Sequence, residues 1–199
     1  MVGYLAGSIP TGYWLVRLLR REDIRKVGSG NIGATNVWRT YGARYGVPVM
    51  LLDTLKGSFP RCWRRSTSAI SPALSRAPLG HWRPLFLKFA RGGKVVATSG
   101  GAFLGVAPLV GGIALVVWIV VFAVCRYASV ASISAAISLP VAAVVLHEPW
   151  PVIVFAAFAA FAALAVVVLH RPNISRLRAG TETRFRFRRS PAAPTRHGV

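Results

Sequence analysis

Three stretches of the sequence combine cationic, amide and hydroxyl side chains with glycine, and these residue types are suited to binding phosphate. A guanidinium group can hold phosphate through two parallel hydrogen bonds, a lysine supplies a point charge, and a glycine turn presents backbone N–H groups. The stretches are GSGNIGATNVWR at 28–39, GGK at 92–94 and HRPNISR at 170–176, with Glu182 shortly after the last. Each motif is weak evidence alone; GGK, for example, lacks the full pattern of a P-loop. Together they predict a site for a phosphate-bearing substrate.

Acidic side chains are too few to suggest a metal centre. The chain has only five Asp and Glu residues, and hard divalent cations prefer several carboxylate ligands. The two cysteines, Cys62 and Cys125, have neither the CxxC spacing of a zinc site nor that of a disulfide framework. We therefore expect neither a metal nor another cofactor.

The composition predicts that membrane spans hold these motifs. Of 199 residues, 54% are hydrophobic and 15% are charged, and the mean hydropathy is +0.51. The formal charge of +20 resides in clusters between and after the apolar runs, where anionic headgroups and the positive-inside rule explain it. No basic stripe is interleaved with aromatics as in nucleic-acid motifs, so nucleic acid is not an expected partner.

The order of apolar runs and basic connectors predicts a topology. The run at 2–19 is expected to form one short first span, and RREDIRK follows it. This basic cluster places the N-terminus outside and the first motif in the cytoplasm. A second run covers 45–60. It carries Asp53 and Lys56, which we interpret as a structural pair that lets the helix enter the bilayer rather than as catalytic groups.

A long apolar region at 98–169 should form four further pieces. Its expected breaks are Pro108 with its following glycines, Arg126, and HEPWP at 147–151. Four crossings place the third motif in the cytoplasm, beside the first two. We expect 1–184 to be a single membrane-embedded domain and 185–199 to be a basic, disordered cytoplasmic tail.

One crossing is missing from this layout. Two glycine motifs on the same side need an even number of crossings between them, but only the run at 45–60 lies there. The stretch at 61–83 occupies the place of the other crossing. It is rich in Arg, Ser and Pro, and four of its arginines, Arg61, Arg64, Arg65 and Arg76, would each cost about 2.5 to 3.5 kcal/mol near the bilayer centre. We predict that this stretch is the product of a shifted reading frame, and that it forms a cytoplasmic loop or misfolds and leaves the neighbouring spans without a packing partner.

The same blocks carry a resemblance to a known family. The order YLAGSIPTGYWLVRL, DIRKVGSGNIGATNVWRTYG, LLDTLKG, LGHWRPLFLKFARGGKVVAT, RYASVASI and HRPNISRLRAGTE resembles the bacterial PlsY family of acyl-phosphate:glycerol-3-phosphate acyltransferases. The resemblance implies an all-α polytopic bundle in the bacterial inner membrane, with seven spans in the family and about six recognisable here. It implies transfer of a fatty acyl group from acyl phosphate to the sn-1 hydroxyl of glycerol 3-phosphate, which gives lysophosphatidic acid without acyl-CoA or a metal.

Residue roles follow from this resemblance, position by position. It implies catalytic roles for Ser29, His170 and Asn173, phosphate binding by Arg39, Gly92, Gly93, Lys94 and Ser129, and structural support from Asn31, Asn36 and Glu182. Either His170 or the phosphate of the substrate could act as the general base. No protein nucleophile is required, because acyl phosphate is already an activated mixed anhydride.

The sequence also departs from the family pattern at several positions. Val95 replaces the last glycine of the GGKG loop, Arg83 stands where the family has an aromatic residue, and one extra residue lies at Ala90 or Arg91. If the loop needs a positive φ at Val95 or a close backbone approach there, restoring glycine should raise activity. Two other functions remain open: an inactive acyltransferase relic, and a non-catalytic transporter of an organic phosphate.

Overall fold

The computed structural model describes residues 2–62, 70–90, 92–148, 152–182 and 184. All regular elements within these ranges are helical. The 3-10 helices are η1 (Ile24–Lys26) and η3 (Leu85–Leu87). The α-helices are α1 (Val2–Ser8), α2 (Thr11–Arg20), α3 (Ala34–Tyr41), α4 (Ala43–Cys62), α5 (Ile70–Trp82), α6 (Val96–Val106), α7 (Pro108–Cys125), α8 (Ala128–Val145), α9 (Val152–Leu169) and α10 (Arg171–Arg178). The predicted tail at 185–199 lies outside the described residues.

The first apolar run forms two helices, so the prediction of one span over 2–19 is wrong. α1 ends at Ser8 and α2 begins at Thr11, with Pro10 between them. Proline has no backbone N–H and keeps the preceding residue out of the helical conformation, which explains the break. In α2, Leu18 and Leu19 are exposed, whereas Val16 is fully buried.

The expected division of the long apolar region is confirmed. α6, α7, α8 and α9 are separated at Ala107, at Arg126–Tyr127 and at 146–151. Within the described residues, two helices are long and apolar enough to cross a membrane, namely α7 and α8, and Val96–Val106 and Ala160–Leu169 are shorter apolar helices. The described part of the chain is thus an all-helical bundle that contains two apolar helices of membrane-spanning length.

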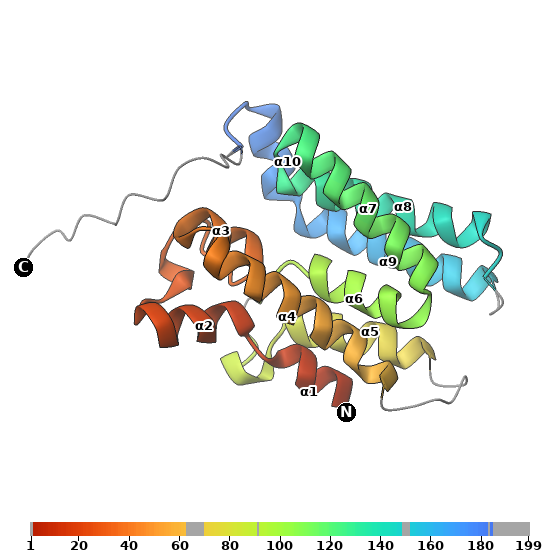
Figure 1. Cartoon of the computed structure of the whole chain (residues 1–199), viewed down its shortest axis with the longest axis horizontal. Coiled ribbons are helices and arrows are strands. Elements are labelled where there is room, and N and C mark those ends of the chain that lie inside the picture. Colours follow the sequence, from red (N-terminus) through yellow and green to blue (C-terminus); the bar gives the residue numbers. More distant parts are fainter. Residues whose placement is uncertain (1, 63–69, 91, 149–151, 183, 185–199) are drawn as a thin grey trace, which may run out of the picture.

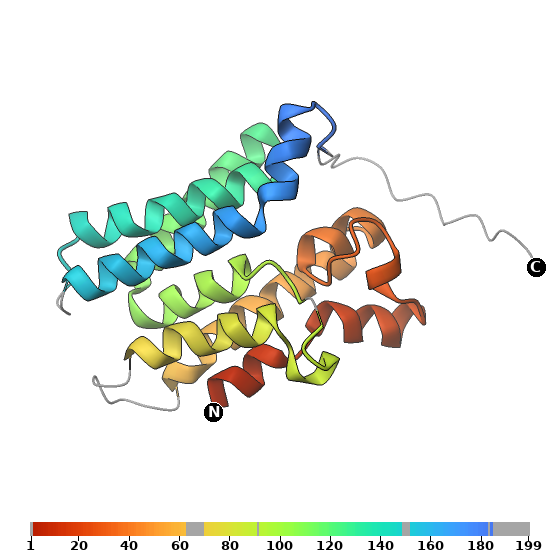
Figure 2. The same ribbon diagram turned by 180° about the vertical axis from the view of Figure 1, so that it is seen from behind.

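The helices are arranged in two groups (Figures 1 and 2). α7, α8 and α9 form one group and run side by side. α6 lies between this group and α4, and α4 packs along α6. A cluster of buried residues joins α6, α7 and α8, and it includes Phe103, Val110 and Leu139. α10 and α3 lie at the same end of the molecule, where α2 also ends (Figure 1).

α5 corrects part of the prediction for 61–83. Residues 70–82 form a helix that packs against α1, rather than a loop that leaves its neighbours without a partner. The two helices approach at small residues: a Cβ on Gly7 would collide with the backbone of Ala77, and one on Gly80 would collide with the backbone of Tyr4. The hydroxyl of Tyr4 also donates to the carbonyl of Arg83 at 2.8 Å.

The structure does not test the prediction for the rest of that stretch. Residues 63–69 lie outside the described ranges, and the shifted reading frame stays a prediction about the gene. With α5 in place, α4 and α5 supply the pair of helices that parity requires between the two glycine motifs.

Candidate active site

A cavity of ≈ 440 Å³ brings the three sequence motifs together. Residues of two glycine-rich loops line its polar part, together with residues of α3, α8 and α10. The first glycine loop is 28–33 and the second is 92–94. The predicted site residues that line it are Ser29, Asn31, Asn36, Arg39, Gly92, Lys94, Ser129, His170 and Asn173. Segments that are far apart in the sequence therefore contribute to one hollow.

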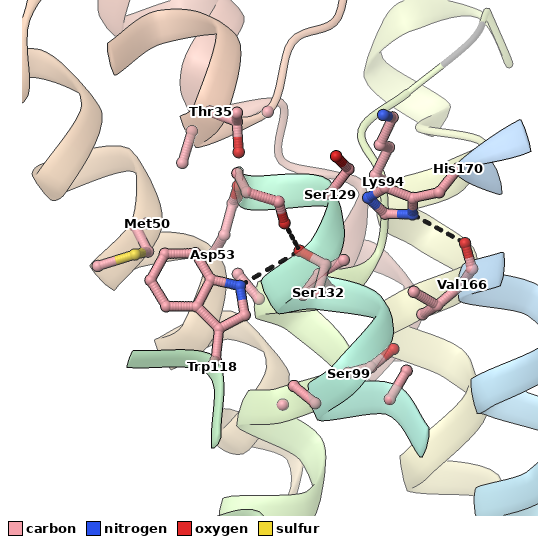
Figure 3. Close-up of a pocket in the computed structure, with 18 of the residues that line it drawn as sticks. Thr35, Met50, Asp53, Lys94, Ser99, Trp118, Ser129, Ser132, Val166 and His170 are labelled. Carbon is pink, nitrogen blue, oxygen red and sulfur yellow. Dashed lines mark hydrogen bonds between the residues drawn. The ribbon is translucent and has the colours of Figure 1, made fainter. Parts of the chain in front are cut away.

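The other part of the cavity is apolar. It continues between α4, α6, α7 and α8, where Trp118 donates from its Nε1 to the hydroxyl of Ser132 at 3.2 Å (Figure 3). The apolar lining includes Met50, Leu51, Leu104, Leu115, Trp118, Ile119, Phe122, Leu139 and Val166. The cavity thus joins a cationic, hydrogen-bonding region to a region suited to hydrocarbon.

Two asparagines shape the first glycine loop. The Nδ2 group of buried Asn36 donates to the carbonyls of Val27 at 3.0 Å and Asn31 at 2.8 Å, and its Oδ1 accepts from the N–H of Ser29 at 2.9 Å. Asn31 Oδ1 accepts from the N–H of Gly33 at 2.8 Å, just before α3 begins. The hydrogen bonds of the Asn36 side chain therefore hold Ser29 at the cavity wall.

This hydrogen-bonded loop conformation requires glycine at position 28. Its φ is +62°, a conformation in which side chains other than glycine are strained, and a Cβ there would collide with Asn36 Oδ1.

Glu182 is the centre of the polar network. Its Oε1 accepts from Asn173 Nδ2 at 2.7 Å and from Ser129 Oγ at 3.3 Å, and it pairs with Arg39 Nη2 at 3.5 Å. Its Oε2 accepts from Arg176 Nε at 2.8 Å. One buried carboxylate thus joins α3, α8 and α10.

The pKa of Glu182 lies below its ordinary value. Burial opposes ionisation, but the hydrogen bonds from Asn173 and Arg176, with the charges of Arg176 and Arg39, outweigh it. The carboxylate is therefore ionised at neutral pH and holds its cationic neighbours in place.

Asn173 is oriented from both sides. Its NH₂ group donates to Glu182, and its Oδ1 accepts a hydrogen bond from the Nζ of Lys94. Since these partners are an acceptor and a donor, they determine which way the amide points. Lys94, from the second glycine loop, is thereby held next to α10.

His170 lies beside Lys94 at the wall of the cavity (Figure 3). Its Nδ1 is 2.8 Å from the carbonyl oxygen of Val166, which can only accept, so Nδ1 carries the proton and Nε2 has the free lone pair. Burial and then the charge of Lys94 lower the pKa of His170 to about 4. At neutral pH this side chain is therefore a neutral hydrogen-bond acceptor.

The second glycine loop packs against the end of α5. The N–H of Gly92 donates to the carbonyl of Trp82 at 2.9 Å, and the N–H of Gly93 donates to that of His81 at 3.1 Å. Phosphate binding through these two N–H groups would require those bonds to break. In the loop as it stands, the Lys94 ammonium is the cationic group that lines the cavity.

Comparison with known proteins identifies the family. A sequence profile of the glycerol-3-phosphate acyltransferase family matches residues 1–180. The glycerol-3-phosphate acyltransferase of Desulforudis audaxviator (strain MP104C) is 43% identical over 191 residues, which are 94% of this chain and 94% of that protein. The enzyme of the same name from Geobacter sulfurreducens is 47% identical over 193 residues, with 93% and 95% covered. The chain belongs to the glycerol-3-phosphate acyltransferase family.

Two solved structures of this family have the same fold. The glycerol 3-phosphate form of PlsY (YgiH), an integral membrane glycerol 3-phosphate acyltransferase, has a TM-score of 0.79, 38% identity and 92% coverage of each chain. Its lysophosphatidic acid form has a TM-score of 0.76 and 36% identity, and covers 94% of this chain and 93% of that one.

Val95, the departure from the family's glycine, does not need the conformation that glycine permits. Its φ is −35°, so the premise of a positive φ is wrong. The side chain is buried against Ala136, Ala163 and Val166, where α8 and α9 meet the loop. The branched residue thus fills a space that glycine would leave empty.

Three cavity residues that can carry charge or exchange protons were not predicted as site residues: Arg176 of the third motif, Asp53, which was interpreted as half of a structural pair, and His81. Arg176 lines the cavity and holds Glu182, three positions after Asn173 on α10, a spacing that places both on one face. Asp53 and His81 also line it. No sequence spacing relates His81 to the motifs, because its proximity depends on how α5 packs.

Proposed function

We propose that this chain transfers a fatty acyl group from an acyl phosphate to the sn-1 hydroxyl of glycerol 3-phosphate, and so produces lysophosphatidic acid. The observation that carries the proposal is the joining of a cationic polar region and an apolar channel in one cavity. An acyl phosphate has both kinds of surface, and its carbonyl carbon would lie at the junction. Membership in the family agrees with this assignment.

In the proposed reaction, the glycerol hydroxyl oxygen attacks the carbonyl carbon of the acyl phosphate. A C–O ester bond forms, the C–O bond to phosphate breaks, and inorganic phosphate leaves. The hydroxyl proton goes either to Nε2 of His170 or to a phosphate oxygen of the substrate. The enzyme contributes positioning and charge neutralisation rather than a covalent intermediate.

The proposed roles use the geometry of the polar region. Lys94 and Arg39 hold the phosphates, with Ser129 beside them, and Glu182 keeps Arg39 and Asn173 in register. Ser29 and Asn173 orient hydroxyl or acyl oxygens. Gly92 and Gly93 belong to the same phosphate site through the loop that carries Lys94.

The proposed location is a bacterial cell membrane, with the polar mouth of the cavity in the cytoplasm and the N-terminus outside. Basic connectors gather at the end that carries α3 and α10, including Arg126, Arg178 and Arg184, and the Nε of Arg184 donates to the carbonyl of Cys125 at 3.3 Å. The positive-inside rule places this end in the cytoplasm. A fluorescent protein fused after the last residue should fold and fluoresce, whereas a periplasmic reporter at the same point should be inactive.

The deciding experiment uses the purified full chain in detergent or vesicles with radiolabelled glycerol 3-phosphate. Palmitoyl phosphate should give labelled lysophosphatidic acid and inorganic phosphate in equal amounts, and palmitoyl-CoA should give none. An Arg39→Ala variant with an unchanged unfolding temperature is the matched control, and it should lose most of the rate. No product from a folded wild-type chain would overturn the proposal and favour the inactive relic.

A further inference from the structure

A buried ionic network lies next to the active-site cavity and takes no part in the reaction proposed above. Its members are Asp53 and Lys56 on α4 and His81 on α5, with exposed fractions of 1%, 7% and 3%. Lys56 Nζ is 2.7 Å from Asp53 Oδ1 and 2.9 Å from His81 Nδ1, and it donates to the carbonyl of Ile9 at 2.8 Å. The hydroxyl of Thr11 donates to Asp53 Oδ1.

The Lys56 ammonium is fully hydrogen-bonded, which makes the contacts around it rigid. An ammonium group has three N–H donors, and the three acceptors named above use all of them. The network connects α4, α5 and the junction between α1 and α2, so the end of α5 is fixed relative to α4 and to that junction. Removal of one member of such a group leaves the others buried without partners, which is strongly unfavourable.

His81 extends this rigidity to the second glycine loop. Because a lysine ammonium can only donate, His81 Nδ1 accepts, and the proton of the neutral ring is on Nε2. The ring lies directly against Gly93, where a Cβ would collide with Nε2, Cε1 and Cδ2. The carbonyl of His81 accepts from the Gly93 N–H as well, so both the backbone and the side chain of His81 fix that glycine.

Lys94 is the residue directly after Gly93, and its ammonium donates to Asn173 at the other wall of the cavity. We propose that His81 is a positioning residue: the Asp53–Lys56–His81 network holds its ring against Gly93, and this contact places the Lys94 ammonium for the substrate phosphate. The inference rests on the proposed role of Lys94. It gives Asp53 and Lys56 a purpose beyond carrying a neutral pair into the bilayer.

The first test compares His81→Leu with His81→Asn. Leucine removes the acceptor for Lys56, whereas the side chain of asparagine can place an oxygen near the position of Nδ1. His81→Leu should raise the KM for glycerol 3-phosphate by about 10- to 100-fold, the scale expected for a binding group displaced by an ångström, with a smaller effect on kcat. His81→Asn should recover most of this loss. Equal KM values for wild type and a folded His81→Leu protein would overturn the inference.

The second test uses Gly93→Ala, which adds the methyl group that collides with the ring. This variant should raise the KM when His81 is present. Asparagine lacks Nε2, Cε1 and Cδ2, so His81→Asn should suppress the effect of Gly93→Ala in the double variant. Additive losses in the double variant would overturn the inference, and this comparison remains decisive if His81→Leu does not fold.

A third comparison separates this inference from the proposed function. His81→Leu should add little to the KM of Lys94→Ala, because the group that it positions is gone, but it should have its full effect in an Arg39→Lys background. If Lys94→Ala leaves the KM unchanged, the proposed role of Lys94 fails. If Lys94→Ala raises the KM and the His81 variants do not, the positioning inference alone fails.

Discussion

Substitution of Glu182 by Gln tests whether one buried carboxylate organises the active site. Glutamine has nearly the same shape, but it carries no charge, and one of its two polar atoms becomes a donor. In the structure both carboxylate oxygens face donors: Asn173 and Ser129 on one side, and Arg176 on the other. The variant therefore places an NH₂ group against an N–H donor whichever way its amide is turned.

The size of the effect follows from the individual contacts. The 2.7 Å bond from Asn173 is buried and charge-assisted, and such bonds contribute about 1.5 to 3 kcal/mol. The Arg176 side chain is 41% exposed, so solvent screening reduces that pair to about 1 kcal/mol or less. The Arg39 contact is longer, at 3.5 Å, and contributes less than a short pair would. We expect a loss of about 2 to 4 kcal/mol, which is roughly 30- to 1,000-fold in kcat/KM if it falls on the transition state.

The assay is the transfer of label from glycerol 3-phosphate to lysophosphatidic acid, measured with the thermal unfolding of the same sample. Glu148→Gln is the matched control, since Glu148 lies in the connection between α8 and α9, away from the cavity lining. The control should stay within about twofold of wild type, as is usual for surface changes. Glu182→Gln activity within threefold of wild type, at an unchanged unfolding temperature, would refute this account of the network.

The remaining predictions concern Lys94, His170, Val95 and Gly7. Lys94→Ala should raise the KM for glycerol 3-phosphate or abolish turnover, because a charged hydrogen bond to a buried phosphate contributes about 2 to 4 kcal/mol; unchanged kinetics in a folded variant would remove Lys94 from the site. The pKa of His170 is lowered to about 4, so the acid limb of the kcat–pH profile identifies the general base. A limb near pH 6 that survives in His170→Gln belongs to the substrate phosphate. A limb near pH 4 that disappears in His170→Gln assigns the base to His170. The unfolded chain binds this proton at the ordinary pKa of 6.5 and the folded chain does not, so this group's contribution to stability is lost as the pH falls from 6.5 towards 4, which a pH series of unfolding temperatures measures. Val95→Gly should lower the unfolding temperature without raising activity, since it empties a packed space; a more active variant would show that the loop still needs glycine. Gly7→Val should lower the unfolding temperature far more than Gly112→Val, because a Cβ meets the Ala77 backbone at the first position and nothing within 4 Å at the second; similar melting of the two variants would contradict the close approach of α1 and α5.

The sequence was sufficient to predict the elements that depend on local signals. The breaks at Pro108 and Arg126 and the helix over 45–60 follow from composition and from proline and glycine, which act on their immediate neighbours. Pro10 carried the same signal, but the surrounding apolar residues outweighed it in our reading, and one span was predicted where two helices form.

Features that depend on packing between distant segments could not be read in the same way. The helix over 70–82 contains proline and arginine and is recognisable through its packing against α1, α6 and α4. His81 likewise acquires its surroundings from α4 and from the second glycine loop. By contrast, the motif residues could be grouped in advance, because basic connectors share one side of a membrane and so must lie near one another.

The contact between α1 and α5 has a consequence for the biogenesis of the protein. Tyr4 and Arg83 are linked by a hydrogen bond although they are 79 positions apart in the chain. α1 precedes α5 in the chain, so it reaches its final packing only after α5 has been synthesised and inserted beside it. Assembly of this bundle cannot proceed strictly from the first helix to the last, and a nascent chain arrested before residue 70 should expose its N-terminal segment to proteases that the complete protein resists.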